Sequence, residues 1–194
     1  MQYNGYVLLP VASYLAWKTA TLNNGYDADG SNGDQCWDLT AEFWYNNGFG
    51  AGYPHTGPNH SAWECWTVSR VENAGDKFDL IYNLSDVKQG DVLVYDQFSI
   101  NPYGHIGFAD EDYATWSAAH PGDYEFPILS QNNQGTPYPP GGTYTNVHGY
   151  DTRLFLGAFR LRSWNPTPPT PSVTTTRKRF PWVLYANKLR NKNM

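Results

Sequence analysis

The order of two hydrophobic periodicities along the chain constrains its fold most. Apolar side chains recur at helical spacing in the segments 11–20, about 36–45 and 63–72. Strand-like apolar runs come later, at residues 91–95, 105–109, 126–131 and 154–162. A chain with its helices first and its strands afterwards predicts an α+β fold, in which N-terminal helices pack on an antiparallel sheet.

The distribution of charge divides the chain into an acidic body and a basic end. All 18 acidic residues lie at or before Asp151 and, against 7 Lys and Arg residues, give residues 1–172 a net charge of −11. Residues 173–194 carry 6 Lys and Arg and no acid. A Pro- and Thr-rich stretch of extended, linker-like composition precedes this end. The predicted organisation is a domain, a linker and a basic aromatic tail: 1–164, 165–176 and 177–194.

The composition argues against nucleic-acid binding and against a membrane-spanning segment. Nucleic-acid binding requires clustered Lys and Arg for phosphate contacts, which the acidic body lacks. No run approaches the roughly 20 apolar residues of a membrane span. Residues 1–9 have neither the basic start nor the apolar stretch of a signal peptide, so we expect synthesis in a cytoplasm and later release, or carriage in a virion.

Cys36 stands where a reactive thiol is expected. It follows a Gly- and Asp-rich loop and begins a predicted helix, whose unpaired N–H groups favour a thiolate and predict a lowered pKa. The alternative is a small, buried core residue. We expect that second role for Cys65, which lies between Trp63 and Trp66, although one of these rings can instead line a substrate groove. A chain of this size has no need of a Cys36–Cys65 disulfide.

Three further residues complete a candidate hydrolytic site. His105 lies on a predicted strand near Gly104 and can take a proton from the thiol and return it to a leaving amine. The alternative is a solvent-facing histidine. Asn132, just after a predicted strand, is expected to orient the imidazole. Gln35 is expected to donate through its side-chain amide to an oxyanion, together with the Cys36 N–H.

These residues lie in blocks that resemble the CHAP family, the cysteine, histidine-dependent amidohydrolases/peptidases. The blocks are residues 27–38, residues 88–95 with 103–107, and residues 128–132, within a resemblance over about residues 8–162. The resemblance implies a papain-like α+β fold. It also implies cleavage of a peptidoglycan amide bond, either as an N-acetylmuramoyl-L-alanine amidase or as a peptide endopeptidase, with Cys36 as nucleophile and His105 as base.

One position departs from the family pattern. Many members have a Glu in the last block where this chain has Ser130. A hydroxyl cannot stabilise an imidazolium by charge, so the orienting role is expected to fall to Asn132.

The loop before Cys36 has the spacing of a calcium-binding loop. Oxygen ligands at close intervals suit a hard cation, and the resemblance implies three carboxylates and two backbone carbonyls: Asp27, Asp29, Asp38, Ser31 and Gly33. Asp34 is a further acid whose role is open. The alternative is a solvated acidic turn. Bound Ca²⁺ would fix the loop and thereby Cys36, and the absence of His and Cys ligands in the loop argues against zinc.

The sequence therefore predicts a phage-type lysin that hydrolyses the peptidoglycan of Gram-positive cells. A virion-associated structural or wall-binding protein with a weak or inactive domain is the alternative that Ser130 keeps open. A protease acting on proteins is a third. The tail 177–194 is interpreted either as a loosely structured terminus or as an anchor for anionic wall polymers or another protein.

Overall fold

The computed structural model describes residues 13–28, 30, 33–47, 49, 53–72, 78–132 and 144–162. Its helices are α1 (Tyr14–Thr21), α2 (Cys36–Asn46), α3 (Glu64–Glu72) and α4 (Tyr113–Ala119). Its strands are β1 (Phe78–Ile81), β2 (Val92–Tyr95), β3 (His105–Ala109), β4 (Glu125–Ser130), β5 (Asn146–Asp151) and β6 (Phe155–Leu161). The predicted linker and tail lie outside the described residues.

The strands form one antiparallel sheet in the order β1-β6-β2-β3-β4-β5. This arrangement confirms the predicted α+β fold. Two strands and one helix were not predicted: β1, β5 and α4. The first three residues of β5 are exposed and the last three are half-buried, so the strand shows no alternation of buried and exposed side chains. It forms because all six of its residues pair with β4. Such an edge strand is defined by its partner and not by its own hydrophobic pattern.

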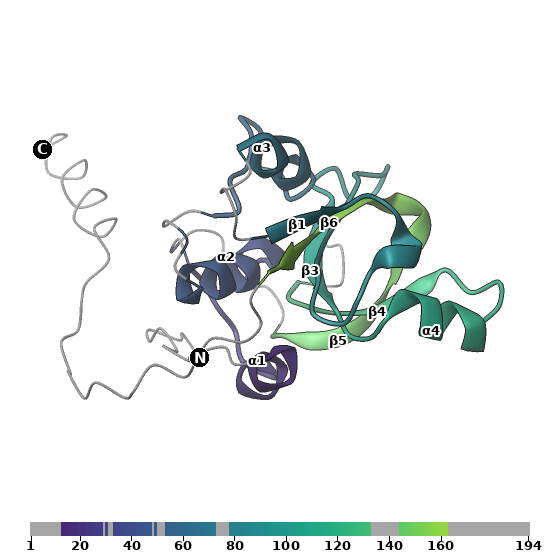
Figure 1. The fold of residues 1–194 in the computed structure, drawn as a ribbon. Coiled ribbons are helices and arrows are strands. Elements are labelled where there is room, and N and C mark those ends of the chain that lie inside the picture. Colours follow the sequence, from purple (N-terminus) through teal and green to yellow (C-terminus); the bar gives the residue numbers. More distant parts are fainter. Residues whose placement is uncertain are drawn as a thin grey trace, which may run out of the picture.

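The sheet separates two apolar clusters, because successive strand residues point to opposite faces. Val92 and Val94 of β2 belong to the cluster that also includes side chains of α1, α2 and α3. Leu93 and Tyr95 belong to the other cluster, beside α4. Figure 1 shows α2 and α4 on opposite sides of the sheet.

Aromatic rings fill the first cluster. Phe43 of α2 meets Phe108 of β3 edge to face, with ring centroids 4.9 Å apart, and Trp17 of α1 lies 5.4 Å from Phe43. Burying one such ring stabilises the fold by roughly 1.5–3 kcal/mol. These contacts fix α2, and therefore the residue that begins it, against the strand that carries His105.

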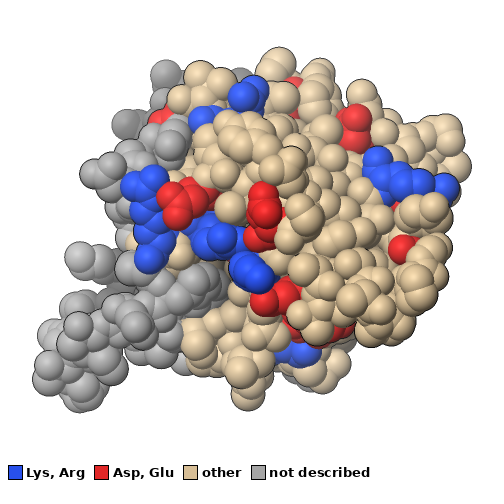
Figure 2. All heavy atoms as spheres, turned by 45° about the vertical axis from the view of Figure 1, so that its right-hand side comes forward, with Lys and Arg blue, Asp and Glu red and all other residues tan. Residues whose placement is uncertain are grey.

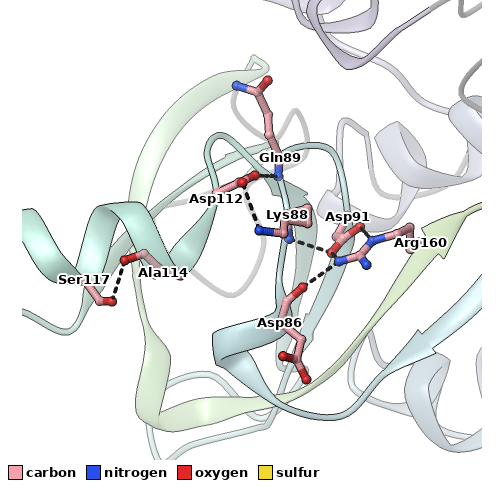
Figure 3. Close-up of polar contacts among 8 residues, drawn as sticks. All are labelled: Asp86, Lys88, Gln89, Asp91, Asp112, Ala114, Ser117 and Arg160. Atoms are coloured by element: carbon pink, nitrogen blue, oxygen red, sulfur yellow. Dashed lines mark hydrogen bonds and ion pairs between the residues drawn. The ribbon is translucent and has the colours of Figure 1, made fainter.

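An ion pair between the buried Asp91 and the half-buried Arg160 explains where β2 begins. The carboxylate of Asp91 accepts two hydrogen bonds from the Arg160 guanidinium, at 2.9 and 2.8 Å, and a third from the Lys88 backbone at 2.8 Å. Figure 3 shows these contacts beside the pair of Lys88 with Asp112. Asp91 therefore closes the preceding turn, and the predicted strand starts one residue later, at Val92. On the face drawn in Figure 2, Lys and Arg lie next to Asp and Glu and form no continuous basic patch.

Candidate active site

Cys36 is the first residue of α2, and a buried carboxylate holds it in place. Asp38 is 1% exposed. One of its oxygens accepts the backbone N–H of Gln35 at 2.9 Å, which starts the helix, and the other accepts that of Ala28 at 2.9 Å. Capping of this kind contributes about 1 kcal/mol. It also ties the acidic loop to the end of α2 that carries the thiol.

The Cys36 thiol is free and the residue is half-buried. Burial raises the pKa of this thiol to about 12, although hydrogen bonds from the backbone of Ile106 and Trp37 act in the opposite direction. The expectation of a lowered thiol pKa is therefore wrong. The helix N-terminus does supply its N–H groups, but the cost of burying a charge outweighs them.

His105 begins β3 and is 2% exposed, which excludes the solvent-facing alternative. Its Nε2 atom lies 2.9 Å from the hydroxyl oxygen of Ser130, at the end of β4. The ring of Tyr150, on β5, stacks on the imidazole with centroids 4.5 Å apart and planes at 11°. The imidazole is thus held at one edge and on one face.

Gly104 lets the chain reach this position. Its φ is +65°, in the left-handed region that favours glycine. A Cβ atom on Gly104 would lie 2.5 Å from the carbonyl oxygen of Tyr95 and 2.8 Å from the Cβ of Trp63. The glycine before His105 is therefore required both by its conformation and by the close packing around it.

The fold brings Cys36 to the start of β3. Its thiol receives a backbone hydrogen bond from Ile106, the residue after His105. Tyr150 lies close to the same thiol, because Cys36 is, after burial, the next cause that raises the Tyr150 pKa. The sulfur and the imidazole therefore share two neighbours, one in the backbone of β3 and one on β5.

Asn132 and Gln35 contact each other. The Asn132 amide nitrogen donates to the side-chain oxygen of Gln35 at 2.7 Å, whereas the hydrogen bond at Nε2 of His105 is made by Ser130. Asn132 has a φ of +52°, and its own side-chain oxygen is buried and accepts no hydrogen bond from the residues that the structure describes. Gln131, which sequence reasoning did not select, is fully buried and donates to the backbone carbonyl of Gln35 at 2.9 Å.

The acidic loop is described in part. Asp29 and Ser31 lie outside the described residues, whereas Asp27, Gly33 and Asp38 lie within them. One carboxylate oxygen of Asp27 is buried and has no hydrogen-bond partner among the described residues. Burial and the charge of Asp27 raise the pKa of Asp34. Two neighbouring carboxylates of this kind fit a hard cation, although the described residues contain no cluster of three or more His, Cys, Asp or Glu side chains that is arranged to hold a metal.

The structure also separates the roles of the tryptophans that the sequence left open. Trp66 is 7% exposed and packs on Phe159, and Cys65 is fully buried, as predicted. Trp63 is half-buried beside Gly104, with its backbone N–H on the carbonyl of Tyr103. This position places an indole next to the strand that carries His105.

Two known proteins are similar to this chain, one in sequence and one in fold. A D-alanyl-L-alanine endopeptidase of Streptococcus phage B30 is 28% identical over 156 residues, which are 79% of this chain and 31% of that protein. The crystal structure of the wild-type endolysin LysIME-EF1 matches with a TM-score of 0.54 and 24% identity, over 79% of this chain and 64% of that one. The chain resembles phage lysins.

These two similarities cover only part of each known protein. The chain spans under a third of the curated relative's length, and the endolysin match shows the α+β fold alone. No protein-family model matches the chain, so the CHAP resemblance stays a prediction. Among the described residues, no helix has both the length and the apolar character needed to cross a membrane.

Proposed function

We propose that this chain is a peptidoglycan hydrolase that cleaves an amide bond with Cys36 as nucleophile and His105 as base. One observation carries the proposal: the thiol at the start of α2 bonds to the backbone next to His105, whose imidazole is held by Ser130 and Tyr150. The similarity to a phage D-alanyl-L-alanine endopeptidase supports peptidoglycan as the substrate.

The reaction follows from which imidazole nitrogen is engaged. Because Nε2 of His105 bonds to Ser130, Nδ1 is the atom that takes the thiol proton. The sulfur attacks the scissile carbonyl carbon, and the carbonyl oxygen becomes an oxyanion near the Cys36 N–H and the Gln35 amide. Collapse breaks the C–N bond, and Nδ1–H protonates the departing amine. Water, deprotonated by His105, then hydrolyses the thioester to release a carboxylate and restore the thiol.

Tyr150 offers the positively charged form of His105 a second stabilising contact. Ser130 orients the imidazole but cannot balance its positive charge. The face of a stacked aromatic ring attracts a cation by about 0.5–2 kcal/mol, and the Tyr150 ring lies parallel to the imidazole at 4.5 Å. We therefore assign to Tyr150 the stabilisation of the imidazolium that forms during attack.

The test is digestion of purified Gram-positive cell walls. The wild-type protein should clear a wall suspension, and Cys36→Ala should not, whereas Cys65→Ala should remain active because Cys65 is packed in the core. Mass spectrometry of the products distinguishes an amidase, which frees the amino terminus of the stem L-alanine, from an endopeptidase. Clearing by Cys36→Ala would refute the mechanism.

We also propose that the acidic loop binds Ca²⁺ through Asp27 and Asp34, with Asp29 as a further ligand expected from the sequence. The support is the buried oxygen of Asp27, which has no hydrogen-bond partner in the described part of the loop, and the charge repulsion between Asp27 and Asp34. Both oxygens of Asp38 already accept backbone N–H groups, so we assign to Asp38 the capping of α2 and not primary ligation. The ion would neutralise the acidic loop and hold it in place.

EDTA should lower wall-clearing activity, and added Ca²⁺ should restore it. Ca²⁺ should also raise the melting temperature of the wild type but not that of Asp27→Asn. Equal activity with and without the chelator, together with an unchanged melting temperature, would argue for a solvated acidic turn.

A wall-binding protein without activity is the second candidate, and the neutral Ser130 beside His105 is the observation that favours it. Sedimentation with insoluble peptidoglycan separates the two functions. A binding protein would co-sediment and release no soluble fragments. An enzyme would release fragments, and Cys36→Ala would retain only the binding.

A further inference from the structure

Gln131 makes four hydrogen bonds through one fully buried side chain. Its Nε2 atom donates to the carbonyl of Tyr26 at 3.0 Å, and its Oε1 atom accepts the N–H of Tyr26 at 2.9 Å. The second Nε2 hydrogen goes to the carbonyl of Gln35 at 2.9 Å. Oε1 also accepts the hydroxyl of Thr145 at 3.1 Å. The amide therefore uses both donors and both acceptor positions.

These contacts join the two ends of the loop that leads to the nucleophile. Tyr26 precedes the acidic loop, and Gln35 precedes Cys36. The residues on either side of Gln131 also contact the site, because Ser130 bonds to His105 and Asn132 bonds to the Gln35 side chain. The three consecutive residues at the end of β4 thus set the positions of both the base and the nucleophile.

The contact with Gln35 has a specific consequence at Cys36. The carbonyl of residue 35 and the N–H of residue 36 belong to one planar trans peptide unit and point in opposite directions. That carbonyl accepts both the Gln131 side chain at 2.9 Å and the Asp38 N–H of α2 at 3.1 Å, and the two contacts together fix the direction of the Cys36 N–H on the other side of the unit. That N–H is the backbone donor assigned to the oxyanion.

We propose that Gln131 is a positioning residue, which orients the Gln35–Cys36 peptide so that its N–H meets the oxyanion. The inference rests on the proposed hydrolase function and deepens it. Gln131 touches neither the substrate nor the thiol in this role. Because the interaction with the oxyanion exists only in the transition state, loss of Gln131 should lower kcat and leave KM nearly unchanged.

The experiment uses the full chain and soluble peptidoglycan fragments of defined composition, with kcat and KM measured separately. Gln131→Met preserves the length of the side chain and removes all four hydrogen bonds. We expect kcat to fall about 100-fold, the usual effect of displacing one oxyanion donor, with KM within about threefold of the wild type. Val87→Ala is the matched control for lost stability, because Val87 is fully buried in the cluster on the other face of the sheet.

Thr145→Val provides a milder variant in case Gln131→Met does not fold. It removes one of the two hydrogen bonds to Oε1, and kcat should fall about three- to tenfold at constant KM. Wild-type kcat in whichever Gln131 or Thr145 variant folds would overturn the inference, and so would an equal kcat loss in Val87→Ala. Failure of the proposed function is distinct, since the wild type would then be inactive or Cys36→Ala active.

Discussion

Glu42 gives the sharpest prediction about stability. It lies in α2, is 3% exposed, and has a single side-chain hydrogen bond, from Asn46 at 3.3 Å. Burial raises the pKa of this carboxyl from 4.5 to about 7, against the small lowering effect of Asn46. The folded protein therefore binds a proton more tightly than the unfolded chain.

The sign of the pH dependence follows from this difference. A raised pKa in the folded state stabilises the fold fully below pH 4.5, and that stabilisation is lost as the pH rises through about 7. At about 1.4 kcal/mol per pKa unit, the total loss is about 3.5 kcal/mol. Of this, about 2.5 kcal/mol should be lost between pH 5 and pH 8.

Glu42→Gln removes the titration and keeps an oxygen that accepts the Asn46 hydrogen bond. Urea unfolding at pH 5 and pH 8 should show the variant gaining about 2.5 kcal/mol relative to the wild type at the higher pH. Glu125→Gln, at an exposed acid on β4, is the control and should change by less than about 0.5 kcal/mol. A Glu42→Gln difference that is the same at both pH values would refute the burial argument.

Three other outcomes follow from the site. Tyr150→Leu should lower kcat about tenfold, whereas Tyr150→Phe, which keeps the stacked ring on His105, should stay within about twofold; equal losses would contradict the stacking role. Asp34→Asn should abolish the Ca²⁺-dependent rise in melting temperature, as measured by calorimetry, and an undiminished rise would remove Asp34 from the ligands. Iodoacetamide labelling of Cys36, followed by peptide mass spectrometry, should keep accelerating from pH 7 to pH 10, because the thiol pKa is about 12; a plateau below pH 8 would show that the thiol is already ionised.

Part of the candidate site could be predicted from local sequence patterns. The helical run from Cys36 and the strand from His105 have strong hydrophobic periodicity, and the structure begins α2 and β3 at these two residues. The α+β class followed from the order of such segments. By contrast, β5 was not predicted because apolar and polar residues do not alternate along it. Helix α4 was not predicted because its seven residues are too few to establish a helical period.

What the sequence determined by itself was the class of fold and the residue types that meet at the start of α2 and β3, because periodicity and glycine placement are local properties. Only the tertiary structure decided which residue at the end of β4, or just after it, contacts which partner. Alternation along a strand would direct residues 130 and 132 to the same side. Instead, β4 ends at Ser130, and the left-handed φ of Asn132 turns its side chain toward Gln35. The thiol pKa was decided in the same way, because desolvation depends on how closely the sheet and helices surround Cys36 and not on its neighbours in the chain.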